Sequence, residues 1–435
     1  MSSLDPSAPA IPSRRTLLLA LAASQLFATS SRAADARYRG PDQVGKPLTP
    51  WLPGSLEIHH IATGRGNSTF VRMPDGTSLL IDAGATLDRL ELSAAPMPDG
   101  SRRPGEWIER YVRRRLGPGK DVGLDYALMT HLHPDHLGDV GDGLPTSKRG
   151  AYRLTGISDA AETLPIGTLI DRGFPNYDYP TSQRPAYLQN YLAYVNERVK
   201  AGGRVESIQV GSYRQIGALY KRRESTEFSV RNVAGNGMIW TGVGDGSAST
   251  FPELRSLSKD DYPNENMCSI AVRISHGKIG YFTGGDLTSY TYDGVSPWRD
   301  ILTAACKAAG HVDVATADHH GLWDGISGDS VRALSPQVWV VPSWHISHPD
   351  MLQLERMFSE RLYAGPRDVF STSVMPANQL INRRLISKLR SINGHVIVRG
   401  SPDGNSFEVV VTDNAEERDT VRLISDPYLG SSGNK

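Results

Sequence analysis

The sequence contains little cysteine and no excess of charge of either sign. Only two cysteines, Cys268 and Cys306, occur in 435 residues, and two thiols do not make a disulfide framework. Cys268 lies in an apolar predicted strand and Cys306 in an alanine-rich predicted helix, so we expect two buried thiols. The 47 basic residues balance the 47 acidic ones, which argues against a protein that binds long nucleic acids.

Long apolar runs are missing as well. Beyond the N-terminal segment, no stretch approaches the roughly 18 consecutive apolar residues that a membrane-spanning helix needs, so we predict no transmembrane segment in the mature chain. With 39% apolar and 22% charged residues, the composition is that of a globular protein and not of a disordered one. The length fits one large α/β domain or two smaller ones.

The N-terminal residues have the features of an export signal. Arg14 and Arg15 precede a short apolar core, 17–28, and small residues at 31–36 give the spacing that a signal peptidase reads. The pattern predicts residues 1–33 as a twin-arginine signal peptide, with the twin-arginine export machinery as a partner and the periplasm or the exterior as the destination. Residues 34–52 carry Pro, Gly and charge without periodicity and are predicted as a linker.

A cluster of metal-competent side chains follows the apolar run 124–129, which we interpret as a buried strand. Because strand side chains alternate, two histidines at spacing two point to the same side where the strand ends. Pro134 then turns the chain into a new element. Imidazole and carboxylate groups together are ligands of zinc, manganese or iron. The candidate ligands in this segment are His131, His133, Asp135 and His136.

This H-x-H-x-D-H pattern resembles the metallo-β-lactamase superfamily. The resemblance implies an α/β fold in which two mixed β-sheets stack between outer helices, a four-layer αββα sandwich, with one or two divalent metals in a cleft at the strand ends. Zn²⁺ is the metal that these residue types favour, and Mn²⁺ is the alternative.

Further landmarks resemble, in order along the chain, the hydrolase domain of the bacterial competence (DNA-uptake) channel protein. They are Gly64-Arg65-Gly66, Ile81-Asp82-Ala83-Gly84, the metal motif, Asn264-Glu265-Asn266, Gly285-Asp286, His319-His320-Gly321 and His348-Pro349. The resemblance also suggests kinship with secreted phosphodiesterases of this branch that act on choline-phosphate groups. The chain has no channel segments, so the resemblance concerns the site and not DNA uptake.

The resemblance implies a role for each landmark. One metal would bind His131 and His133, and the other would bind Asp135, His136 and His320, with Asp286 shared between them. Asp82 would support the site from behind its ligands. Asp135, His319 and His348 are expected to take part in catalysis. His319 would contact the substrate or its leaving group, and His348 would bind a phosphate oxygen or act as a general acid.

One superfamily ligand has no counterpart in this chain. No histidine occurs between His136 and His276, and the position of the third histidine of the first metal is occupied by Asn264-Glu265-Asn266. We expect Glu265 or Asn266 to supply an oxygen ligand instead. The missing histidine argues against β-lactamase and glyoxalase-type activities, which use it.

The remaining chain is predicted as one hydrolase domain, 53–425. It would contain a cap-like insertion around 140–262, where strong strand patterns are few, and a flexible Gly/Ser-rich tail would follow at 426–435. A helix predicted at 105–116 carries several arginines. We interpret them as a solvated face, with attraction of an anionic substrate as the alternative.

Together these inferences predict an exported hydrolase in which metals activate a hydroxide. The predicted substrate is a small or locally bound phosphodiester. Because the same nucleophile attacks carbonyl carbon, a lactone, amide or thioester is the alternative substrate. A further alternative is a binding protein that contains metal but no longer catalyses.

Overall fold

The computed structural model describes residues 43–87, 90–119, 122–220 and 227–432. The predicted signal peptide and residues 34–42 of the predicted linker lie outside these residues. Within the described ranges, no helix combines the length and the apolar character that crossing a bilayer requires.

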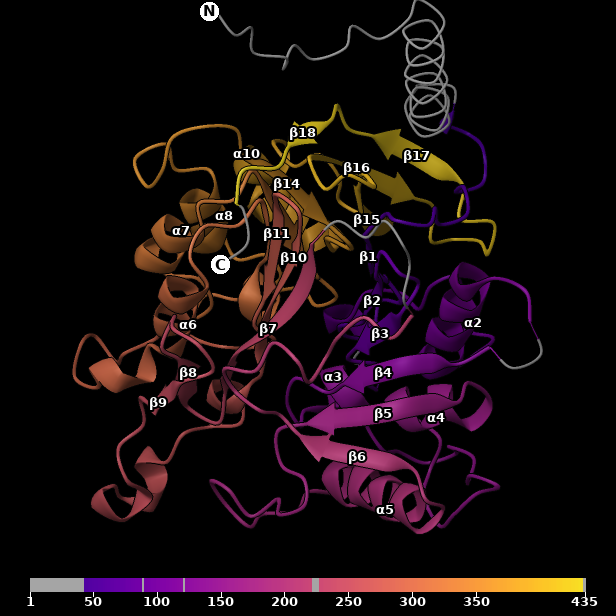
Figure 1. The fold of residues 1–435 in the computed structure, drawn as a ribbon, viewed down its shortest axis with the longest axis vertical. Coiled ribbons are helices and arrows are strands. Elements are labelled where there is room, and N and C mark those ends of the chain that lie inside the picture. Colours follow the sequence, from indigo (N-terminus) through magenta and orange to yellow (C-terminus); the bar gives the residue numbers. More distant parts are fainter. Residues whose placement is uncertain (1–42, 88–89, 120–121, 221–226, 433–435) are drawn as a thin grey trace, which may run out of the picture.

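Two mixed β-sheets form the centre of the molecule (Figure 1). The strands of the first sheet, in spatial order, are β17 (Val421–Ile424), β16 (Ser406–Thr412), β15 (His395–Gly400), β1 (Glu57–His60), β2 (Thr69–Arg72), β3 (Ser78–Ile81), β4 (Leu124–Leu128), β5 (Ile166–Asp171) and β6 (Arg204–Ser207), with β18 (Tyr428–Leu429) paired to β16. Those of the second are β14 (Asp368–Ser371), β13 (Val338–Val341), β12 (Val314–Thr316), β11 (Ile279–Thr283), β10 (Ala271–His276), β7 (Phe228–Gly235), β8 (Met238–Trp240) and β9 (Ser247–Ser249).

Helices cover the outer face of each sheet. They are α2 (Pro104–Leu116), α4 (Gly156–Thr163), α5 (Ala186–Lys200), α6 (Ile301–Ala309), α7 (Gly328–Leu334), α8 (Met351–Met357), α9 (Pro376–Ile381) and α10 (Arg383–Ile386). The short helix α3 (Pro134–Leu137) instead follows the end of β4. Figure 1 shows α2, α4 and α5 beside the first sheet and α6, α7 and α8 beside the second.

Alternating strand side chains build three apolar layers between these elements. In β4, Leu128 enters the core between the sheets and Ala127 enters the core beneath α2, α4 and α5. In β13, Val340 enters the same central core and Trp339 faces α6, α7 and α8. Each fully buried Leu or Val side chain stabilises the fold by about 1.5–3 kcal/mol. These layers confirm the predicted four-layer αββα sandwich.

The functional residues follow strands whose ends meet at one edge of the sandwich. β3 and β4 are parallel neighbours in the first sheet, and β11, β12 and β13 are parallel neighbours in the second. The carboxyl ends of parallel strands lie at the same edge. The two sheets are joined at this edge by a hydrogen bond from the Ile270 N–H to the Thr130 carbonyl, 2.9 Å.

Residues 140–262, the predicted cap-like insertion, contribute largely to the sandwich itself. They supply β5 and β6 at the end of the first sheet and β7, β8 and β9 at the end of the second. α4 and α5 pack on the outer face of the first sheet. The edge strand β6 carries polar residues such as Arg204 and Glu206, so its sequence has only a weak strand pattern.

The two ends of the described chain are held to the body. Gly45 donates its N–H to the Val421 carbonyl at 2.8 Å, within the predicted linker. In the predicted flexible tail, Ser431 donates from Oγ to Asp313 Oδ1 at 2.7 Å, and β18 pairs with β16. Residues 428–432 therefore make hydrogen bonds to the body of the fold.

The predicted pair of buried thiols is confirmed. Cys268 and Cys306 are both free and buried. Cys306 lies in α6 as expected, whereas Cys268 ends a short 3-10 turn, Asn266–Cys268, that precedes β10. The strand predicted around Cys268 is β10, which begins at Ala271, after this turn.

Candidate metal centre

Five strand ends bring the predicted site residues together. Asp82 follows β3, and the histidine motif follows β4. Asp286 follows β11, His320 follows β12 and His348 follows β13. The residues come from both sheets, which is why segments as far apart in the sequence as Asp82 and His348 form one site.

Four of these residues place possible metal ligands within 4.8 Å of one another: Asp135, His136, Asp286 and His320. His136 Nε2 lies 3.1 Å from Asp286 Oδ1, and His320 Nε2 lies 3.0 Å from Asp135 Oδ2. The two Nε2 atoms are 3.3 Å apart. Two imidazoles and two carboxylates form a donor set that suits zinc or manganese.

The imidazole orientations fit a metal site. His136 donates from Nδ1 to Asp82 at 2.7 Å, and His320 donates from Nδ1 to the Pro342 carbonyl at 3.1 Å. A histidine that donates from Nδ1 in this way presents Nε2 to a metal, and such partners hold the ring in place. Both Nε2 atoms point into the cluster, so the residues present fit a divalent cation.

His131 and His133 adjoin the same cluster. His131 Nε2 lies 3.7 Å from Asp286 Oδ2 and 3.1 Å from His133 Nδ1. Asp286 therefore contacts His131 in addition to His136 and His320. Although burial opposes ionisation, His136 and His320 hold the pKa of Asp286 well below its usual range.

Asp82 lies behind the cluster, fully buried. Its carboxylate accepts hydrogen bonds from the Thr130 N–H at 2.7 Å and from Asn67 Nδ2 at 3.1 Å, besides that from His136. The residue adopts a left-handed backbone conformation, φ 61°. Its contacts suit the supporting role predicted for it.

Close packing and backbone strain accompany the site. A Cβ on Gly84 would come 2.0 Å from the Asp135 carbonyl oxygen, and one on Gly66 would come 2.4 Å from it. Gly66 and Gly84 can therefore pack against the backbone of the metal motif only because they have no side chains. His319 and His320 both have positive φ, 50° and 54°. For residues with side chains this conformation is strained, and such strain concentrates at functional sites.

His319 is oriented by a carboxylate that the sequence analysis did not identify. His319 donates from Nδ1 to Asp324 Oδ1 at 2.6 Å, and its Nε2 lies 3.8 Å from Asp286 Oδ2. Burial lowers the pKa of His319, but Asp286 and Asp324 outweigh it and raise the pKa above its ordinary value. Asn266 Nδ2 is 3.1 Å from the same Nε2. The only sequence signal for this pairing is an acidic residue, Asp324, four positions after the histidine pair.

His348 packs directly on His320. The two rings stack with centroids 4.9 Å apart and planes 18° from parallel, and Trp344 meets His348 edge-on at 5.6 Å. The His348 side chain is buried, and its Nδ1 has no hydrogen-bond partner among the described residues. Burial, assisted by the neighbouring imidazoles, lowers the pKa of His348 well below its ordinary value. A neutral ring at this position donates one hydrogen bond without carrying charge.

Glu265, one of the two predicted oxygen ligands, lies in a network of other contacts. Glu265 forms a two-pronged ion pair with buried Arg172, in which Arg172 Nε lies 2.6 Å from Oε1 and a second nitrogen contacts Oε2. Oε1 also accepts the Leu132 N–H at 2.8 Å. The carboxylate thus holds the backbone between the two motif histidines. Of the two predicted oxygen ligands, Asn266 remains available, because its Oδ1 is buried without a described partner.

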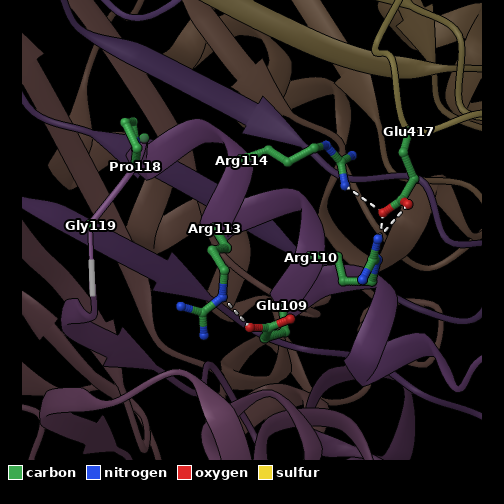
Figure 2. A pocket seen from close by; sticks show the side chains of 8 residues that line it. Glu109, Arg110, Arg113, Arg114, Pro118, Gly119 and Glu417 are labelled. Atoms are coloured by element: carbon green, nitrogen blue, oxygen red, sulfur yellow. Dashed lines mark hydrogen bonds and ion pairs between the residues drawn. The ribbon is translucent and has the colours of Figure 1, made fainter. Parts of the chain in front are cut away.

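Three arginines of α2, Arg110, Arg113 and Arg114, lie in ion pairs at a surface pocket of about 490 Å³ (Figure 2). Arg110 binds Glu417 at 2.6 Å, and Arg113 binds Glu109 at 2.6 Å. Arg114 contacts both Glu417 and Asp419. Because each guanidinium faces a carboxylate, the pocket has little charge left to attract an anion. None of the proposed metal ligands lines it.

Proton competition at the centre predicts how metal uptake depends on pH. Burial lowers the pKa of His320, but Asp286 and Asp135 raise it to about 9 when no metal is bound. Below the ordinary pKa of histidine, protonated His320 stabilises the metal-free fold through its pairing with the two carboxylates. This stabilisation is lost as pH rises through about 9. Metal binding requires the neutral imidazole.

Apparent zinc affinity should therefore rise with pH between about 7 and 9, by roughly tenfold per unit for each displaced proton. Competition with a chromophoric chelator across this range measures the slope. A metal affinity that does not change with pH would contradict the assignment of His320.

Comparisons with known proteins agree with the fold. Residues 61–152 match the family model of the metallo-beta-lactamase superfamily. Comparison with curated protein sequences yields no match.

Several solved structures are similar to this chain at low identity. A putative metal-dependent hydrolase from Parabacteroides distasonis has 11% identity and a TM-score of 0.31, over 72% of this chain and 92% of that one. Zn²⁺-bound PqqB from Methylobacterium extorquens has 12% identity and a TM-score of 0.32, over 61% of this chain and 72% of that one. We assign no function from these likenesses.

Proposed function

We propose that this chain, which carries a metallo-β-lactamase superfamily domain, is a metal-dependent hydrolase that cleaves small phosphodiesters. The observation that carries the substrate class is the pair of additional imidazoles beside the metal centre. His319 contacts Asp286, and His348 stacks on His320. Phosphoryl oxygens develop negative charge during hydrolysis, and nearby donors stabilise it.

The candidate metal ligands are His131, His133, Asp135, His136, Asp286 and His320, with Asn266 as an additional oxygen donor. A divalent cation held there acts as a Lewis acid and activates water for attack. Zn²⁺ is the metal that we propose, and Mn²⁺ is the alternative, because the donor set mixes imidazole and carboxylate groups.

We assign different tasks to the two additional histidines. His319 donates from Nδ1 to Asp324, and Asn266 Nδ2 donates to its Nε2 beside the cluster. The raised pKa lets Nε2 take up a proton once Asn266 turns its amide to a metal or a substrate, which suits proton transfer to the leaving group. His348 is neutral and buried, which suits a hydrogen bond to a phosphoryl oxygen more than proton donation.

A lactone, amide or thioester hydrolase is the second candidate, because the activated water also attacks carbonyl carbon. A protein that binds metal without catalysing is a third. Export by the twin-arginine route to the periplasm or beyond remains a prediction from Arg14 and Arg15, which lie outside the described residues.

A substrate panel tests the proposal. An aryl phosphodiester, an aryl phosphomonoester, a homoserine-type lactone and a cephalosporin are compared with zinc or manganese supplied. We expect the diester to be the best substrate. His348→Ala should then lower diester turnover by roughly 100-fold, as expected of a hydrogen-bond donor in the transition state, while metal content stays unchanged.

Two results would contradict this reading. If the lactone leads and His348→Ala has no effect, the carbonyl alternative replaces the phosphodiester. If the metal-loaded protein turns over none of the four compounds, the binding-protein alternative is favoured. His311→Ala serves as a matched control, because His311 bonds Ser431 in the C-terminal segment and contacts no metal-centre residue among its hydrogen bonds.

A further inference from the structure

Two loops leave the metal centre and join at its rim. Residues 287–300 follow Asp286, and residues 322–326 follow the 3-10 turn Asp318–Gly321 that carries His319 and His320. Ser289 donates its N–H to the Asp324 carbonyl at 2.9 Å and its Oγ to the Gly325 carbonyl. The loop after one candidate ligand is thus bonded directly to the loop after another.

Three aromatic side chains meet where these loops join. The Tyr290 ring contacts Trp323 edge-on with centroids 4.8 Å apart, and it contacts Tyr292 at 4.9 Å. Trp323 remains 46% exposed and Tyr292 53% exposed. Tyr292 and Asp293 both have positive φ, 52° and 55°. The loop therefore holds large rings at the surface at a conformational cost.

The aromatic cluster lies close to the reacting centre. Trp323 directly precedes Asp324, which binds His319 at 2.6 Å, and His319 Nε2 lies 3.8 Å from Asp286. Tyr290 is four residues beyond Asp286 in the other loop. The rings are therefore tied to the metal centre through the Asp324–His319 contact on one loop and through the chain from Asp286 on the other.

We infer that Tyr290, Tyr292 and Trp323 form a stacking subsite for a planar ring of the substrate, such as a nucleobase. Exposed aromatic faces bind bases by stacking without requiring a particular sequence. A cationic ligand fits less well, because the Arg299 guanidinium already stands 4.9 Å from the Tyr292 ring centre. The inference rests on the proposed function and narrows its substrate to diesters that carry an aromatic group.

The experiment compares thymidine 5′-(p-nitrophenyl phosphate) with methyl p-nitrophenyl phosphate as substrates of the metal-loaded enzyme. Loss of one stacking partner changes binding by roughly 5- to 150-fold. We expect Trp323→Ala to raise KM for the nucleoside ester by about tenfold or more, with kcat and metal content unchanged. Trp323→Phe keeps a ring and should restore KM. Tyr213→Ala is the control, because Tyr213 is a similarly exposed aromatic (41%) outside the two loops.

A KM within about twofold of the parent value in Trp323→Ala would overturn the subsite, as would failure of Trp323→Phe to restore it. If the methyl ester shifts equally, the stacked ring is that of the leaving group, which also supports the subsite. Equilibrium dialysis with thymidine 5′-monophosphate separates this inference from the proposed function. Weaker binding to Trp323→Ala supports the subsite even if no diester is hydrolysed, and equal binding to both proteins overturns it.

Discussion

Asp286→Asn is expected to remove most of the metal and to lower hydrolytic activity by roughly 1,000-fold or more. Asp286 Oδ1 lies 3.1 Å from His136 Nε2, and Oδ2 lies 3.5 Å from His320 Nε2 and 3.7 Å from His131 Nε2. Asparagine keeps the shape but lacks the charge. A metal contributes several kcal/mol of transition-state stabilisation, which corresponds to a loss of this size.

Elemental analysis and turnover of the purified variant check this expectation. Asp159→Asn is the matched control, since Asp159 is also buried and pairs with Arg103 at 2.8 Å on the outer side of the first sheet. The control should lose some stability and keep its metal. Full metal content and activity in Asp286→Asn would mean that the carboxylate cluster is not the metal centre.

Local patterns in the sequence were sufficient for the part of the site that lies within one segment. The apolar run before His131 indicated a buried strand, and β4 occupies Leu124–Leu128. Spacing two in H-x-H indicated a common direction, and the two rings lie 4.8 Å apart. Asp286 and His320 depended on the family resemblance, because no local rule relates residues more than 100 positions apart.

Tertiary pairing could not be derived in the same way. Glu265 has the chemistry of a metal ligand, and only the position of Arg172 in space, 93 residues away, shows that its oxygens are engaged elsewhere. The orientation of His319 by Asp324 was missed for a related reason. A short loop with two left-handed residues brings them together, and single-sequence patterns do not predict that conformation.

Because Glu265 is paired with Arg172, replacing Glu265 is expected to cause the second large effect, a fall in the free energy of unfolding. Its side chain is 20% exposed and that of Arg172 is 3% exposed. Removing one partner of a buried ion pair leaves an uncompensated charge and typically costs 3–5 kcal/mol, and the partial exposure of Glu265 places our expectation near the lower end, about 3 kcal/mol. Glu265→Ala also leaves the Leu132 N–H without its acceptor.

Because Leu132 lies between His131 and His133, loss of the Glu265 carboxylate should also disturb the positions of these candidate ligands. We expect Glu265→Ala to weaken metal affinity by roughly 10- to 100-fold, as for other residues that support ligands without touching the metal. Glu265→Gln retains an oxygen for the Leu132 N–H, so it should lose less metal affinity than the alanine variant. Denaturant unfolding gives the change in free energy, and chelator competition gives the change in affinity.

The two measurements together distinguish a positioning carboxylate from a ligand. A positioning role predicts that stability and metal affinity fall together in Glu265→Ala and that Arg172→Met reproduces the loss of stability. A direct ligand predicts loss of metal with unchanged stability of the metal-free protein. Glu417→Gln is the control for charge alone, because the Glu417 side chain is 33% exposed in its pair with Arg110. Exposed pairs contribute about 0–1 kcal/mol, so this control should stay close to the parent protein in both measurements.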